Sequence, residues 1–137
     1  MEKSRSITVY RVVMGISIVL NILVGIFILV WPYTFATVLG QPQPSPATWP
    51  RHWGAQLLAI NLLYLPGFAD PVHNRYINYL GIVIRLSFAA FFFTQGRGFP
   101  TMGIYDGTSG LLLLATYLFV PRASTSTAEV GVLVSPA

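Results

Sequence analysis

Apolar residues along this chain fall into four long runs, separated by short segments rich in proline, glycine or charged residues. A helix needs about 20 mostly apolar residues to cross the hydrocarbon core of a bilayer. The pattern therefore predicts an all-α membrane protein, a four-transmembrane-helix bundle formed by residues 1–121, with a flexible C-terminal tail at 122–137. The four predicted spans are residues 10–31, 53–68, 76–94 and 102–120.

The residues between the runs predict where the helices end. The first run closes on Trp31 and Pro32, an interfacial aromatic residue followed by a residue that stops helices. This run is too long for a signal peptide and no small-residue cleavage site follows it, so we expect a retained span. Four prolines within residues 41–50 predict an extended, stiff loop. The second run is short, and Pro66 and Gly67 mark its end.

Composition supports the membrane interpretation. Apolar residues make up 54% of the chain and charged residues only 9%, against roughly 25% charged in ordinary soluble domains. The formal net charge of +4 does not predict a nucleic-acid partner, because the aromatic residues lie inside the apolar runs rather than among the basic residues. We expect membrane lipid as a partner and no nucleic acid.

Basic residues next to the spans predict the orientation, because cytoplasmic flanks carry an excess of Lys and Arg. With the N-terminus inside, the outer loops hold only Arg51 and Arg97. The inner flanks then hold Lys3, Arg5, Arg11, Arg75 and Arg122. The prediction is N-in/C-in, with both termini cytoplasmic.

Polar residues inside the predicted spans need partners or a function, because unsatisfied polar groups are costly in lipid. Arg85 lies roughly 13 Å from each end of the third span at helical rise, which is the middle of the bilayer. Asn21 and Asn61 lie at a similar depth in the first and second spans. We expect the three side chains to face one another inside the bundle.

Arg85 also needs a counter-charge, and Asp106, about one turn into the fourth span, is the acid nearest to it in depth. The two Cα atoms should differ by roughly 8 Å in depth, a gap that an arginine side chain largely covers. We predict an Arg85–Asp106 ion pair with Asn21 and Asn61 beside it. Two interpretations stay open: the polar network only fastens the helices, or it forms a site that opens outward. The mouth of such a site would carry Arg51, Trp53, Gln56 and Tyr105.

Several kinds of chemistry are not expected. The chain has no cysteine, which excludes thiolate metal sites and cysteine nucleophiles. His52 and His73 begin the second and third spans and should lie about a bilayer thickness apart, so they cannot share a metal or haem. No phosphate-binding loop, HExxH or GxSxG pattern occurs. We assign no catalytic residue, no metal ligand and no cofactor held through protein ligands.

The segments YRVVMGISIVLNILVGIFILVWP at 10–32 and WGAQLLAINLLYL at 53–65, with an arginine in the third span and Asp-Gly in the fourth, resemble the DoxX-like group of small bacterial four-helix membrane proteins. The resemblance covers roughly residues 8–121. It implies a bacterial cytoplasmic (inner) membrane. Some members of the group are similar to subunits of a quinone-linked oxidoreductase, and no family active-site motif can be matched to this chain.

Two functions follow as hypotheses. The first is an accessory or structural subunit of a larger membrane complex, with no catalytic activity of its own, suggested by the short loops and the lack of metal or redox ligands. The alternative is a DoxX-like membrane oxidoreductase component or carrier. It would bind a quinone or other hydrophobic small molecule, or a lipid, at an Arg85–Asp106 pocket. Arg85 would hold an anionic or carbonyl group, and Tyr105 or Tyr64 would donate a hydrogen bond.

Overall fold

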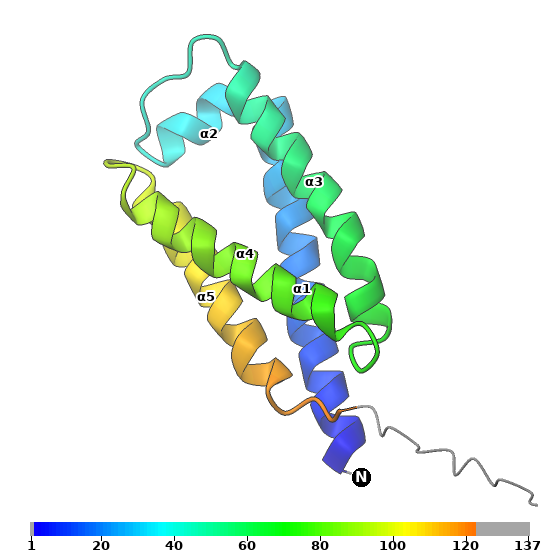
Figure 1. Cartoon of the computed structure of the whole chain (residues 1–137). Coiled ribbons are helices and arrows are strands. Elements are labelled where there is room, and N and C mark those ends of the chain that lie inside the picture. Colours follow the sequence, from blue (N-terminus) through cyan, green and yellow to red (C-terminus); the bar gives the residue numbers. More distant parts are fainter. Residues whose placement is uncertain (1, 123–137) are drawn as a thin grey trace, which may run out of the picture.

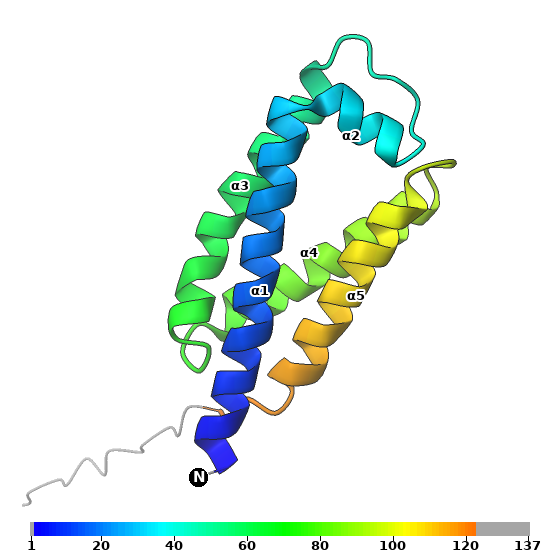
Figure 2. The ribbon, with the colours of Figure 1, turned by 180° about the vertical axis from the view of Figure 1, so that it is seen from behind.

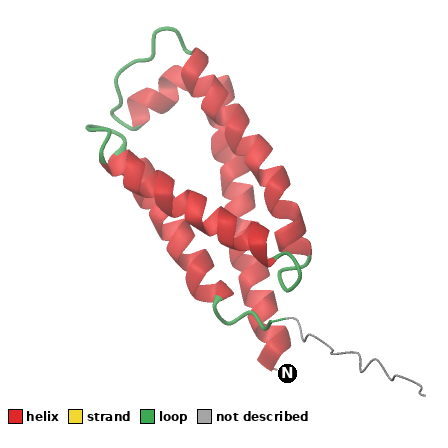
Figure 3. Cartoon of the chain, viewed as in Figure 1, coloured by secondary structure: helices red, strands yellow, loops and turns green. Residues whose placement is uncertain are grey.

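The computed structural model of the chain describes residues 2–122, and this range forms five α-helices (Figures 1 and 3). They are α1 (Glu2–Val30), α2 (Pro32–Val38), α3 (Thr48–Ala69), α4 (Arg75–Phe93) and α5 (Pro100–Tyr117). The all-helical prediction is confirmed for these residues. The predicted tail lies outside the described residues, except for Arg122.

The four long helices run up and down in turn, as two antiparallel hairpins (Figures 1 and 2). One hairpin is α1 with α3, and the other is α4 with α5. The hairpins meet through α1 with α5 and α3 with α4. They lie close together at the end where α1 begins, here called the N-terminal end, and diverge toward the end where α2 lies across the gap, here called the α2 end.

Two of the helices are long and apolar enough to cross a membrane. They are Ser4–Val30 of α1 and Arg75–Phe93, the whole of α4. In the most apolar part of each helix, only 28% of α1 and 33% of α4 is buried inside the molecule. Both helices therefore present apolar side chains outward.

Helix α2 was not predicted from the sequence. Trp31, with φ −126° and ψ 59°, leaves the helical conformation because a proline follows it. Pro32 then begins a new short helix, since a first-turn residue needs no hydrogen-bonded N–H. The buried side chains Pro32, Phe35 and Ala36 form one face of α2, at a helical spacing that the sequence already contained.

The loop predicted at 41–50 extends too far toward the C-terminus, because its last residues are helical. Helix α3 begins at Thr48, five residues before the predicted span. Pro50 is the reason: it lies in the first turn of α3, where proline is tolerated. Likewise Pro66 does not end α3 but lies inside its last turn, and the helix continues to Ala69.

A close-packed core fills the N-terminal half of the bundle. Its buried side chains come from all four long helices and from the segment just after α5: Tyr10, Met14, Ile18, Tyr64, Ile82, Leu113, Tyr117 and Val120. The rings of Tyr10 and Tyr117 lie 4.8 Å apart between α1 and α5. This core holds the hairpins together at one end, so any cavity between them lies toward the α2 end.

Polar contacts fasten the loop between α3 and α4 at the N-terminal end. Arg11 donates hydrogen bonds to the carbonyls of Phe68 and Ala69, which are left without helical partners at the end of α3. Tyr117 donates to the carbonyl of Pro71 at 2.9 Å. The backbone and side chain of His73 donate to Asp70 and lower the pKa of its carboxyl, so the carboxylate stays ionised and holds the turn.

Candidate functional site

The middle of the bundle is polar on the inside and apolar on the outside. Asn21, Asn61 and Arg85 are 2%, 4% and 3% exposed. The residues that follow Asn61 in α3, Leu62 and Leu63, are 67% and 65% exposed. Buried polar side chains with exposed leucines beside them agree with the two helices that are long and apolar enough to cross a membrane.

Arg85 and Asp106 form an ion pair between α4 and α5. Arg85 Nη1 donates to Asp106 Oδ1 at 3.1 Å, and the two side chains are 4% and 13% exposed. The Arg85 guanidinium also lies over the ring of Tyr64 from α3, 5.6 Å from its centroid. The contact between Arg85 and Asp106 that was predicted from their depth is therefore present, and Tyr64 of α3 also contacts Arg85.

A chain of hydrogen bonds crosses the bundle beside this pair. Tyr105 of α5 donates to Asn21 Oδ1 at 2.8 Å, and Asn21 Nδ2 donates to Asn61 Oδ1 at 3.3 Å. Asn61 then donates to the carbonyl of Leu57 at 2.9 Å, within α3. The chain joins α5, α1 and α3. It places Asn61 against Asn21, which lines the smaller cavity together with Arg85 and Asp106.

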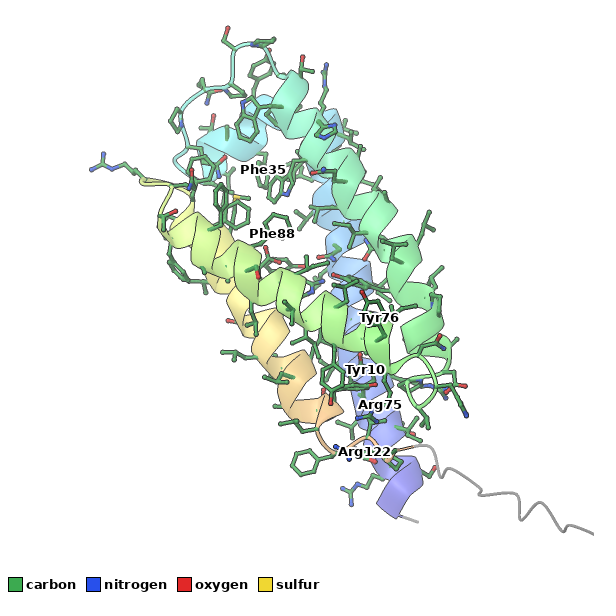
Figure 4. The ribbon with its side chains drawn as sticks, viewed as in Figure 1. Tyr10, Phe35, Arg75, Tyr76, Phe88 and Arg122 are labelled. Atoms are coloured by element: carbon green, nitrogen blue, oxygen red, sulfur yellow. The ribbon has the colours of Figure 1, made fainter. Side chains whose placement is uncertain are left out.

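Two adjoining cavities lie between the hairpins on the α2 side of the core. The larger, of about 130 Å³, has mostly apolar walls supplied by α1, α2, α3 and α5; they include Val24, Phe35, Leu39, Trp53, Leu57 and Met102, with Tyr105 and Asp106. The smaller, of about 30 Å³, is lined by the polar residues Asn21, Gln56, Arg85 and Asp106, and by apolar residues of α3 and α4 that include Phe88. Trp53, Leu57 and Asp106 line both cavities. In Figure 4, Phe35 and Phe88 lie in the space that α2 closes at one end.

The smaller cavity contains hydrogen-bond donors without acceptors. Arg85 Nε and Nη2 are buried and have no hydrogen-bond partner among residues 2–122, since Asp106 accepts from Nη1 alone. Buried donors are normally satisfied by protein, water or a ligand. Arginine cannot lose its charge to relieve this, so an acceptor is needed here.

Most of the residues predicted for the site lie together, and one does not. Arg85, Asp106, Asn21, Gln56 and Tyr105 line one or both cavities, and Asn61 supports Asn21. Arg51, which was expected at the mouth, is exposed in the first turn of α3 and is not among the residues that line either cavity.

The sequence missed the part of the wall that comes from α2 and from the turn before α5. Gln41, just beyond α2, donates to the carbonyl of Gly98 at 3.4 Å and to Met102 Sδ at 3.0 Å. Gly98 has a φ of 86°, and a side chain there would meet the backbone of residues 39–41. These contacts hold α2 over the gap. The apolar spacing of Pro32, Phe35 and Leu39 is the signal that could have revealed it.

The histidines are far from this site. His52 lies in α3 at the α2 end, and His73 lies in the loop that follows the other end of the same helix. Among residues 2–122 no group of three or more His, Asp or Glu side chains is placed to hold a metal ion. The site is thus built from arginine, aspartate, amides and phenols.

Comparison with models of protein families, with curated proteins and with solved structures finds no match to this chain.

Proposed function

We propose that the chain is a four-span membrane protein that binds a lipid-soluble small molecule between its two hairpins. α3 and α5 run antiparallel to the two span-like helices and present apolar side chains outward, among them Leu62, Leu63 and Leu65 on α3 and Leu111 and Leu112 on α5. Two of the polar residues in these helices, Asn61 and Asp106, face the interior. A helix that crosses a membrane exposes apolar side chains to lipid, and every long helix of this bundle has such exposed side chains.

The N-in orientation in a bacterial cytoplasmic membrane is part of this proposal. Arg5, Arg11, Arg75 and Arg122 belong to the N-terminal end of the bundle, whereas Arg51 and Arg97 belong to the α2 end. The larger basic cluster should face the cytoplasm. The cavities, which lie toward the α2 end, would then be nearer the outer face.

The orientation can be tested with single cysteines, because the chain has none of its own. In intact cells, a membrane-impermeant maleimide should label Gln43→Cys and Gln95→Cys, in the two loops of the α2 end. It should not label His73→Cys until the membrane is permeabilised. Labelling of His73→Cys alone would reverse the orientation, and labelling of all three in intact cells would contradict the four-span arrangement.

The observation that carries the binding function is the pair of unpaired, buried Arg85 N–H groups beside an apolar cavity. A few convergent polar groups in a mostly apolar pocket are typical of small-molecule sites. The resemblance to the DoxX-like group adds a quinone as a candidate ligand. The described residues that line the two cavities include no nucleophile paired with a base, so we propose a carrier or the ligand-holding component of a membrane oxidoreductase.

Co-purification tests this function. The protein is extracted from its membrane in mild detergent, and small molecules are released with organic solvent and identified by mass spectrometry. We expect a neutral, ring-containing compound at close to one per chain. The matched control is Arg85→Met with Asp106→Leu, which removes both charges at similar volume and should retain much less of the compound. Equal amounts from both proteins would contradict binding at this site.

A second candidate function, an accessory subunit of a larger membrane complex, rests on exposed aromatic residues in the last turn of α4. Phe91 and Phe93 are 53% and 55% exposed there, and aromatic residues are enriched at protein–protein interfaces. Native mass spectrometry of the same detergent extract distinguishes the two. A partner chain that stays bound would support the subunit role, and a lone chain that retains a small molecule would favour the carrier.

A further inference from the structure

We infer that the ligand of this pocket is an uncharged molecule with one ring and a carbonyl-type acceptor, and that the site rejects carboxylates and other anions. The inference rests on the proposed function and narrows its ligand class. It follows from three features of the described residues: which Arg85 donors are free, how the charge of the site is balanced, and the shapes of the two cavities.

The free donors define the chemistry of the ligand group. Nε and Nη2 of Arg85 are buried without partners, and both can only donate. The ligand must therefore present a hydrogen-bond acceptor. The Tyr105 hydroxyl is already committed to Asn21. Gln56 and Tyr64 also line the smaller cavity, and Arg85 supplies its charged donors to the acceptor.

The charge balance decides between a neutral and an anionic acceptor. Within the described part of the chain, Arg85 and Asp106 are the only charged residues that line either cavity, and they already neutralise each other at 3.1 Å. A neutral acceptor leaves the site neutral. An anion would leave one uncompensated negative charge beside the Asp106 carboxylate in a medium of low dielectric constant, which is strongly unfavourable.

The cavities fit one ring and its acceptor group. A cavity of about 150 Å³ with apolar walls holds a benzene molecule, and the larger cavity here is about 130 Å³. The rings of Trp53 and Phe35, whose centroids are 5.8 Å apart, form part of its wall. The smaller cavity, of about 30 Å³, contains Arg85, and it leaves room there for a group the size of a carbonyl.

Three matched probes test the inference on the purified full-length chain: acetophenone, with a neutral carbonyl; ethylbenzene, without an acceptor; and benzoate, an anion at neutral pH. Trp31→Phe and Trp49→Phe leave Trp53 as the single tryptophan, so its quenching by acetophenone reports binding in the pocket. Ethylbenzene and benzoate are measured by displacement of acetophenone. We expect acetophenone to bind about 10-fold or more tightly than either, because it makes a hydrogen bond to a charged donor. The ¹⁵N–¹H signal of Arg85 Nε should shift only with acetophenone.

Two variants make the outcome specific. Asp106→Asn leaves the charge of Arg85 uncompensated and should reverse the preference toward benzoate. Arg85→Met with Asp106→Leu keeps an apolar cavity and should bind acetophenone and ethylbenzene equally. If Asp106→Asn does not fold, the test is the comparison of acetophenone and ethylbenzene binding between the unaltered protein and the double variant.

The possible failures separate the two proposals. If ethylbenzene binds the unaltered pocket as tightly as acetophenone, or benzoate binds more tightly, a small-molecule pocket remains and the inferred ligand class is wrong. If acetophenone does not quench Trp53 and no probe binds, both the ligand class and the proposed function are overturned.

Discussion

Replacing Asp106 with alanine is expected to destabilise the folded bundle by about 3–5 kcal/mol, because it leaves a buried arginine without its counter-charge. Arg85 is 3% exposed, and Nη1 would join Nε and Nη2 as a third buried donor site without an acceptor. The cation cannot be neutralised by losing a proton. The measurement is the free energy of unfolding in mixed detergent–dodecyl sulfate micelles, with helix content followed by circular dichroism.

Two controls show whether the destabilisation comes from the unpaired Arg85 charge or from the loss of a carboxylate alone. Asp70→Ala removes the carboxylate of the exposed turn between α3 and α4, where water replaces the lost contacts, and its effect should be far smaller. Arg85→Met with Asp106→Leu removes both charges and should recover most of the stability, since apolar replacement of a whole buried pair is often neutral or better. A double variant as unstable as Asp106→Ala would show that packing, and not the unpaired charge, is responsible.

The contact between Arg85 and Asp106 could be predicted because depth along a helix follows directly from residue number. Polar side chains at one level of several apolar helices have few places to go except toward one another. The same reasoning placed Asn21 beside Asn61, and their hydrogen bond is present at 3.3 Å. The depth of a residue in a helix does not predict which of its donor atoms remain unpaired. The unpaired Nε and Nη2 of Arg85 could therefore be identified only from the structure.

The boundaries and the cavities were harder to predict, for a different physical reason. Proline was interpreted as a helix end at Pro32 and Pro66 and as part of a stiff loop at Pro50. The structure instead begins a helix at Pro32, and it has Pro50 in the first turn and Pro66 in the last turn of α3. The effect of a proline depends on whether an N–H is needed at that position. The divergence of the two hairpins depends on side-chain packing between segments that are distant in the sequence. The spacing of apolar residues within one helix does not predict such packing.

Replacing Gly54 with alanine is expected to separate α1 from α3 and to destabilise the bundle, because the two helix backbones touch at this point. A Cβ on Gly54 would lie 2.8 Å from the carbonyl oxygen of Gly25, with Leu29 Cγ at 3.1 Å and Ile28 Cβ at 3.2 Å. The nearest of these is a backbone atom and cannot turn aside as a side chain would. Overpacking of this kind costs about 1–3 kcal/mol, and close approach at small residues is a main source of attraction between helices in membranes.

The matched control is Gly107→Ala in α5, one residue after Asp106. A Cβ there would meet only Ala89 Cβ, at 3.4 Å, which is an ordinary contact. Both substitutions gain the same helix propensity, up to about 1 kcal/mol per residue, so this term cancels when the two variants are compared. The unfolding free energy of Gly54→Ala should therefore lie about 1–3 kcal/mol below that of Gly107→Ala. Equal values would mean that α1 and α3 do not approach as closely as described. Because Trp53 precedes Gly54 and lines both cavities, only Gly54→Ala should also change the fluorescence of Trp53.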